Sequence, residues 1–527
     1  MKKFIAFILC ISLALGCTAC ASQTQTPTPD QDAPSANTAS PNGTESTKKD
    51  TIVIGVENDV VQFDPAMTGD IAQKHYIRQV FDTLVENDAD ENPVPCLAES
   101  WEWSDDSTEI TFHLRDDVYF TNGDLMTADD VVFSINRSIE AGMNTVMTDV
   151  MEGMEKIDDT TVLLKLKLAY PALSCLMDAA FSVVNKNLVE ADPDGYAQNP
   201  VGTGAYILKE HIIGDSTIYE ANPDYFKGEA PIKNLIMKTI STSSVLIALE
   251  NGEVDVSLSV DKNDISYIEA TEGIEISTTA NGNYYALVFN LADEHFSNKL
   301  VREAVLYAIN KQDILTGAFN DIGQIVDVPI HPIFSDYVPT DLHGVEQNIE
   351  YARQLLAEAG YADGFSTTIM TDQESQYKMP AQIIQAQLAQ IGITVQIEEM
   401  DRNVWLSNIN NGEYGGLTCY SLNARVMDPD SNLYTFFHSS CLNGGGNFFN
   451  YSNPEMDALL DRGRTLSSEG ASAERKQVYH DIAQTLMDDV VVIPYVMSIN
   501  GLTYRSEVKN VEAQFLKFYK VYNYSFN

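Results

Sequence analysis

The chain has 527 residues, of which 44% are hydrophobic and 20% are charged. It is too apolar for a disordered protein and too long for one hydrophobic core, so we expect two or three domains. Lys and Arg number 32 and Asp and Glu number 76, a net charge of −44 that nucleic acid and anionic membrane surfaces would repel. We therefore expect a soluble, monomeric protein that binds no nucleic acid.

The first 20 residues have the pattern of a targeting signal. Two lysines are followed by an apolar run over residues 4–15, which is too short for a comfortable membrane span. The segment resembles a bacterial lipoprotein signal, which is cleaved just before a cysteine that then carries lipid. Cys20, in Thr-Ala-Cys, is the favoured lipidation site, and Cys17, after Ala-Leu-Gly, is the alternative.

Residues 21–49 form a polar segment that contains four prolines and no large apolar side chain. Such a segment cannot bury enough apolar surface to offset its ordering entropy, so we expect a flexible tether that spans on the order of 30 Å. No later run of 18 apolar residues follows. The expected location is the cell envelope, on the outer face of the cytoplasmic membrane, or the periplasm if the source has an outer membrane.

The rest of the chain alternates strand and helix patterns. Strands are predicted over 51–58, 110–115 and 393–397, and helices over 71–84 and 351–360, with Gly360 as a C-terminal stop. This alternation indicates α/β layers.

Two local features have structural interpretations. Thr127 precedes an apolar helical run and can cap its first N–H groups. Gly202 and Gly204 suit a tight crossing between domains, where a Cβ atom would clash.

Four cysteines lie beyond the signal, and none has zinc-type spacing: Cys96, Cys175, Cys419 and Cys441. We expect them to be buried, or singly paired as disulfides outside the cell. The eight histidines are dispersed, and none pairs at helical spacing. The sequence therefore predicts neither a metal site nor a cofactor.

The stretch PVPCLAESWEWSDDSTEITFHLRDDVYFTNGDLMTADDVVFSINR (93–137) resembles the hallmark region of a known family. This is the bacterial extracellular solute-binding protein family 5, the substrate-binding lipoproteins of peptide/nickel-type ABC importers. Further segments match in family order, among them NPVGTGAYIL (199–208), NPDYFKG (222–228), VREAVLYAINKQDIL (301–315) and YSNPEMDALL (451–460).

The resemblance implies an α/β, periplasmic-binding-protein-like two-lobed fold with an additional inserted small domain. Lobe I would comprise 50–85, 193–283 and 495–527. Domain II (86–192) would be inserted in it, and lobe III would span 284–494. The ligand would bind between lobes I and III, which close like hinged jaws.

The implied function is the capture of di- to oligopeptides and their delivery to the permease and ATPase subunits of an ABC importer. The same fold could instead bind a nickel chelate, haem, an opine or an oligosaccharide. A secreted hydrolase that uses paired acids is the remote alternative. The chain has no Gly-x-Ser-x-Gly or His-Glu-x-x-His motif, so we expect no enzyme.

The resemblance also implies where a peptide would lie. Its backbone would pair with the first strand around Glu57 and Asn58, and with a strand around 418–422. Peptide-binding members place an Asp just beyond that second strand for the ligand ammonium, but here either Asn423 fills the position or a local insertion shifts it. Asp428 could serve instead, or could form a turn beside the following proline.

Other candidates could line the same cleft. Arg425 could bind a ligand carboxylate or form a surface or inter-lobe ion pair. The remaining candidates are aromatic residues that could equally pack in the core: Tyr284, Tyr285, Trp405, Tyr420 and Tyr495.

Overall fold

The computed structural model describes residues 49–527 apart from 69–70, 89–91, 143–147, 171, 425, 443 and 515–518. These residues belong to one compact unit. The predicted signal and nearly all of the predicted tether, with Cys17 and Cys20, lie outside the described residues. No helix within the described part of the chain is long and apolar enough to cross a membrane.

One large mixed sheet runs through both lobes. Its lobe I strands are β1 (Thr51–Val56), β8 (Tyr206–Ile212), β9 (Ser216–Ala221), β10 (Asn234–Thr239) and β11 (Val256–Ser257). Its lobe III strands are β13 (Gln324–Ile325), β14 (Phe365–Thr371), β15 (Ile393–Glu399) and β16 (Leu417–Asn423). The order is β15-β14-β16-β12-β17-β11-β1-β10-β9-β8, and β13 pairs with β17. The predicted strands at 51–58, 110–115 and 393–397 are confirmed with shifted ends, and so is the α/β class.

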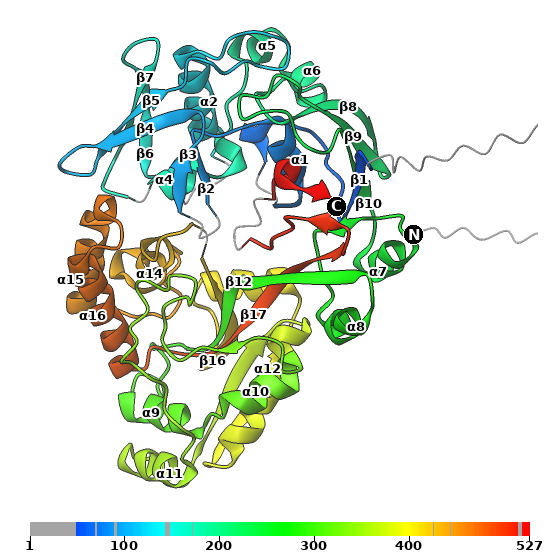
Figure 1. Ribbon diagram of the computed structural model, residues 1–527. Helices are drawn as coiled ribbons and strands as arrows, with labels where there is room; N and C mark the ends of the chain where they lie inside the picture. Colours follow the sequence, from blue (N-terminus) through cyan, green and yellow to red (C-terminus); the bar gives the residue numbers. More distant parts are fainter. Residues whose placement is uncertain are drawn as a thin grey trace, which may run out of the picture. The chain divides into compact units, whose positions relative to one another are not determined.

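Two long antiparallel strands, β12 (Ile274–Phe289) and β17 (Val492–Arg505), cross from one lobe to the other (Figure 1). Residues 274–280 pair with 505–499, and residues 284–288 pair with 497–492. Between these stretches, residues 281–283 lie opposite Ser498 alone, so the ladder bulges at the predicted boundary between lobes I and III.

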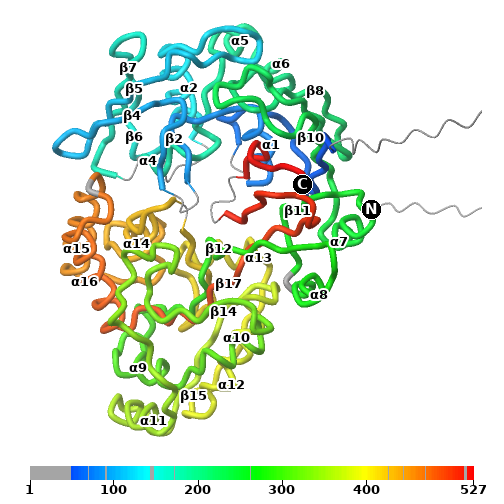
Figure 2. Tube along the Cα trace, in the orientation of Figure 1, coloured from blue at the N-terminus to red at the C-terminus, as the bar shows by residue number. Residues whose placement is uncertain are grey.

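The parallel strands of both lobes point their carboxyl ends toward this bulge. In lobe III, β16 is antiparallel to β12 and ends with Asn423 opposite Asn283, and β14 and β15 run parallel to β16. In lobe I, β11 is antiparallel to β17 and ends at Ser257, opposite Thr503, and β1 and β10 run parallel to β11. The two sets of carboxyl ends therefore face each other across the crossing strands, whose path Figure 2 follows as a trace.

Domain II has its own four-stranded sheet, ordered β4-β5-β7-β6. The strands are β4 (Ala98–Trp103), β5 (Glu109–Leu114), β6 (Met151–Lys156) and β7 (Thr161–Leu166). Helix α2 (Ala128–Ala141) begins with a capping box in which Thr127 and Asp130 each accept a hydrogen bond from the other's backbone N–H, as predicted for Thr127. Trp101 and Trp103 are only half-buried, but both pack against the core of this domain.

Short strands form two separate two-stranded antiparallel sheets, one of β2 (Val85–Asn87) and β3 (Pro93–Pro95), the other of β18 (Val508–Lys509) and β19 (Ser525–Phe526). The helices of lobe I and domain II besides α2 are α1 (Ile71–Val80), α4 (Ala172–Leu176), α5 (Lys186–Ala191), α6 (Pro193–Gln198), α7 (Thr242–Asn251) and α8 (Ile265–Ala270). Lobe III contains α9 (Lys299–Ala308), α10 (Lys311–Phe319), α11 (Ile349–Glu358), α12 (Ser375–Ala389), α13 (Arg402–Asn410), α14 (Asp430–Phe437), α15 (Pro454–Thr465) and α16 (Ala473–Asp489).

Helix α1 ends at Val80, four residues before the predicted end. The carbonyl of Val80 accepts a hydrogen bond from the N–H of Gly204 at 2.8 Å, so a neighbouring segment replaces the next helical donor. A Cβ atom on Gly204 would lie 2.5 Å from the backbone of Val80, and one on Gly202 would lie 2.0 Å from it. The clash predicted at both glycines is therefore confirmed.

The apolar side chains form separate clusters in lobe I, domain II and lobe III. Val426, from the lobe III loop after β16, packs inside the domain II cluster. All four cysteines of the folded part are free thiols, three of them buried and Cys441 half-buried. The loop around Val426 therefore joins lobe III to domain II through apolar packing, without a disulfide between these cysteines.

Candidate ligand-binding site between the lobes

The lobe I side of the candidate site is the carboxyl end of β1. Glu57 and Asn58 follow this strand directly, and both are exposed. The hydroxyl of Tyr76 donates to the carbonyl of Asn58 at 3.1 Å, and the N–H of Gly214 donates to the carboxylate of Asp59 at 2.6 Å. Glu57 and Asn58 are therefore presented on a backbone that the buried Tyr76 and the exposed Gly214 hold in place.

The lobe III side is formed by residues that follow β14 and β15. Asp372 comes directly after β14 and is fully buried, whereas Arg402 opens α13 just beyond β15 and its side chain is 45% exposed. Arg402 Nη1 donates to Asp372 Oδ2 at 2.7 Å. Its guanidinium carbon lies 5.7 Å from the ring centre of Tyr377 and 5.9 Å from that of Trp405.

The same aromatic group connects this arginine to β16. The hydroxyls of Tyr377 and Ser421 are 2.9 Å apart, and the rings of Tyr377 and Tyr285 lie 5.6 Å apart. Burial lowers the pKa of Arg402. The charge of Glu374 and the contact with Tyr377 raise this pKa by more than burial lowers it, so the net shift is upward. The guanidinium therefore stays charged at every physiological pH.

Most of the aromatic candidates are buried in this structure. The exposed fraction is 1% or less for Tyr284, Trp405 and Tyr495, and 5% for Tyr285. The indole N–H of Trp405 donates to Thr418 Oγ1 at 3.3 Å. These side chains pack in the interior of lobe III and present little surface to solvent.

Tyr420 and Asn423, on β16, are partly exposed. Tyr420 packs between Trp405 and Phe448, with ring centres 5.4 and 4.7 Å away. The carbonyl of Asn423 accepts a hydrogen bond from the side-chain amide of Asn432 at 3.2 Å. Asn423, the last residue of β16, lies at the edge that faces lobe I, whereas Tyr420 lies three residues earlier in the strand.

Asp428 has partners within lobe III. It is 6% exposed, and its two oxygens each accept a 2.8 Å hydrogen bond from Arg475, which is fully buried. Its Oδ1 also accepts from the N–H of Asp430 at 2.9 Å. The geometry thus fits the turn interpretation of Asp428 rather than a ligand contact. Arg425 lies outside the described residues.

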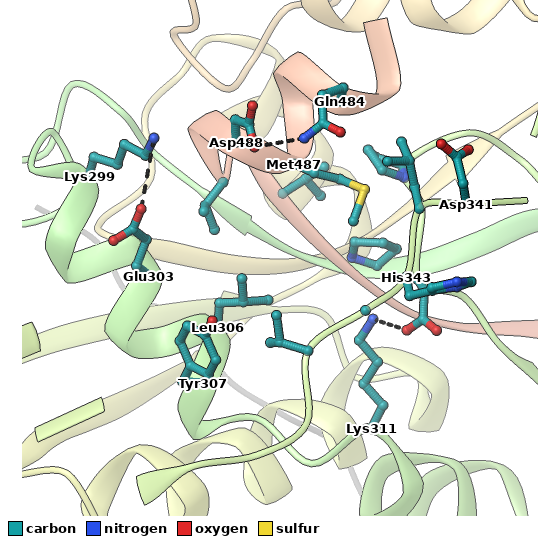
Figure 3. Close-up of a pocket in the computed structure, with 18 of the residues that line it drawn as sticks. Lys299, Glu303, Leu306, Tyr307, Lys311, Asp341, His343, Gln484, Met487 and Asp488 are labelled. Atoms are coloured by element: carbon teal, nitrogen blue, oxygen red, sulfur yellow. Dashed lines mark hydrogen bonds and ion pairs between the residues drawn. The ribbon is translucent and has the colours of Figure 1, made fainter. Parts of the chain in front are cut away.

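Within the part of the chain that the structure describes, no three His, Cys, Asp or Glu side chains are grouped to hold a metal ion. A cavity of about 400 Å³ does occur in lobe III, between α9, α16 and the loop over residues 341–345 (Figure 3). Val492 and Pro494 line it, so it lies toward the start of β17, away from the bulge. At its base Lys311 pairs with Asp327 at 2.8 Å, and burial lowers the pKa of this lysine.

Two lobes joined by a pair of crossing strands, with the carboxyl ends of parallel strands facing each other, define a bilobal solute-binding protein. Residues 92–444 match the model of the bacterial extracellular solute-binding proteins, family 5 Middle. The chain belongs to this family, which consists of binding proteins rather than enzymes.

Individual relatives bind different solutes. The chain is 25% identical over 516 residues to heme-binding protein A of Haemophilus influenzae, covering 91% of this chain and 93% of the relative. It is 26% identical over 462 residues to the oligopeptide-binding protein AppA of Bacillus subtilis, covering 82% and 84%. The structure of HbpA2 from Haemophilus parasuis superposes with a TM-score of 0.83 at 25% identity, covering 90% of this chain and all of that one.

Sequence reasoning missed Asp372 and Arg402, and it included Ser421 only as part of the strand around 418–422. Arg402 lies five residues beyond the predicted strand at 393–397, and Asp372 directly follows β14, which was not predicted. Polar residues just beyond a strand are typical of ligand sites in α/β sheets. That signal was available. Ser421 had no comparable signal, because its role depends on the Tyr377 hydroxyl, 44 residues away.

Proposed function

We propose that this protein is the lipid-anchored receptor of an ABC importer, and that it captures di- to oligopeptides between its lobes. It would then deliver them, chemically unchanged, to the permease. The observation that carries the proposal is the pair of opposed strand edges. Ligands of open α/β sheets bind beyond the carboxyl ends of the parallel strands, and here two such edges meet at one seam.

The bulge supports a hinge at this seam. The side-chain amide of Asn281 donates to Ser498 Oγ at 3.0 Å, and the N–H of Ala424 donates to the carbonyl of Gly282 at 2.8 Å. The first bond joins the two crossing strands β12 and β17, and the second joins β12 to the residue after β16. Both lie at a short irregular segment, where a small backbone change would rotate one lobe against the other. A solute that contacts both edges would stabilise the closed arrangement.

The peptide assignment is supported by strand termini on both sides of the seam. A peptide in an extended conformation could add to these termini through its backbone, which all peptides share. The AppA relative carries the name of an oligopeptide-binding protein. The lipid anchor on Cys20, or on Cys17, would keep the receptor beside its permease.

The test uses the full chain, purified in detergent without refolding. A pool of random tri- to pentapeptides should raise the midpoint of thermal unfolding, because a ligand at 100 times its Kd stabilises the folded state by about 2.7 kcal/mol. A flat response to the pool, together with a shift caused by another solute class, would refute the peptide assignment. Mass analysis of Cys20→Ser and Cys17→Ser variants would show which cysteine carries lipid.

Haem is the second candidate ligand, because heme-binding protein A matches over 91% of the chain. Titration of the full chain with haemin, followed by absorbance in the Soret region, would detect a saturable complex. Saturation at one equivalent, with no response to the peptide pool, would favour haem over peptides.

A further inference from the structure

We infer that Arg402 is the anion anchor of the seam, and that the transported solute therefore carries a carboxylate. The inference rests on the proposed function, because it assumes that the solute lies between the lobes. It adds the chemical class of the solute and the side chain that selects it. Arg402 belongs to α13, at the edge of lobe III that faces lobe I.

Asp372 and two aromatic rings hold the guanidinium of Arg402 in one orientation. Its partner Asp372 is fully buried and also accepts the N–H of Glu374 at 2.8 Å, so the carboxylate is fixed. Two aromatic rings, those of Tyr377 and Trp405, lie within 6 Å of the guanidinium carbon. A half-exposed arginine oriented by a buried carboxylate and by rings is preorganised for a second anion.

Glu374 would compete with the ligand. Its carboxylate lies 3.0 Å from the same Nη1 atom that binds Asp372, and its side chain is 45% exposed. An exposed ion pair of this kind contributes little, so an incoming carboxylate can displace it. Both ion pairs engage Nη1, and a guanidinium has five N–H donors in all, enough for a further carboxylate.

The charge of the whole chain makes such an anchor necessary for an anionic solute. With a net charge of −44, the protein repels carboxylates at long range, so binding one requires a local cation. A peptide with a free C-terminus and a haem with free propionates both meet this requirement. A neutral oligosaccharide does not.

The experiment compares a random tri- to pentapeptide pool that has free C-termini with the same pool amidated, using the full chain and calorimetric titration. The wild-type protein should prefer the free acids roughly tenfold to a hundredfold, the range of a charge-assisted hydrogen bond. Arg402→Gln should lose this preference while still binding the amidated pool. Glu374→Gln should bind the free acids a few-fold more tightly, because it removes the competitor.

Two variants serve as controls. Arg402→Lys keeps a positive charge beside the buried Asp372, so a loss of folding is not expected in this variant. It should keep part of the preference for free acids over amides. Arg353→Gln removes the charge of an exposed arginine on α11, whose guanidinium donates to the carbonyl of Gln390, and should behave as wild type.

Each outcome decides a separate question. A wild-type protein that binds both pools equally, or an Arg402→Gln variant that keeps the preference, overturns the anchor and leaves the proposed function intact. If neither pool binds, haemin and its dimethyl ester replace the two pools, and the same preference for free carboxylates is expected. Failure of both peptide pools, with binding of haemin, refutes the peptide assignment and leaves the anchor to be tested on haemin. Failure to bind any of the four probes refutes the anchor as well.

Discussion

The ion pair between Asp428 and Arg475 offers a direct test of whether Asp428 is structural. Arg475→Met removes a fully buried guanidinium that also donates to the Tyr337 hydroxyl at 2.9 Å and to the Gly463 carbonyl at 3.0 Å. Asp428 would then remain as a buried, unpaired charge. Breaking a buried pair in this way costs about 3–5 kcal/mol.

The cost converts into a measurable shift of the unfolding midpoint. The folded unit of about 480 residues has an unfolding entropy near 1 kcal/mol/K, so the expected decrease in Tm is roughly 3–5 °C. The double variant Asp428→Asn with Arg475→Met removes both charges and should recover at least about 2 kcal/mol of the loss. Differential scanning fluorimetry and urea unfolding of the four proteins provide the complete cycle.

Ligand titration of the same proteins separates the two interpretations. If Asp428 is structural, Asp428→Asn binds the peptide pool within about twofold of wild type, because both carboxylate oxygens face Arg475. A loss of affinity of more than tenfold in correctly folded Asp428→Asn would instead make it a ligand contact. A cost below about 1 kcal/mol for Arg475→Met would refute the burial argument itself.

Three further predictions concern stability and reactivity. Gly204→Ala should lower the free energy of unfolding in urea by about 2–3 kcal/mol, because the new Cβ atom would contact backbone atoms. Gly214→Ala is the control: it has a φ of +76° but open space around it, and should lose only about 1 kcal/mol. Equal losses would contradict the packing argument. Burial raises the pKa of Glu86, but the charges of two lysines lower it to about 2. The stabilising effect of the Glu86 carboxylate is therefore complete above pH 4.5 and is lost as the pH falls toward 2. The difference in stability between wild type and Glu86→Gln, about 3 kcal/mol at most near pH 7, should shrink at pH 3. In a variant with the three cysteines of the predicted signal (Cys10, Cys17 and Cys20) replaced by serine, a thiol reagent should label half-buried Cys441 before unfolding and the buried cysteines only after it. Early labelling of a second thiol would contradict the burial.

Local patterns were enough to predict much of the fold. The alternation in residues 110–115 and the apolar run at 393–397 predicted strands, and Gly360 marked the end of a helix, because these signals depend only on side-chain periodicity and backbone freedom. The motif over 93–137 led to the family. The end of α1 was mispredicted, because its last carbonyl bonds to Gly204, more than 120 residues away.

The candidate site was predicted less completely, for a physical reason. Trp405 and Tyr495 are of residue types that often line ligand clefts. A sequence does not tell which face of a strand or helix is buried by its neighbours, and both side chains are fully buried here. Asp428 looked like a possible ligand group until Arg475 was found to occupy both its oxygens.

The sequence by itself determined the acidic charge balance, the α/β alternation and the family, and it predicted a targeting signal, because each depends on composition or on short-range pattern. Only the tertiary structure decided that two sets of strand ends face each other across β12 and β17, and that a buried Asp372 holds Arg402 at that edge. Those facts depend on strand order and on contacts between residues 30 or more positions apart, which no local pattern encodes.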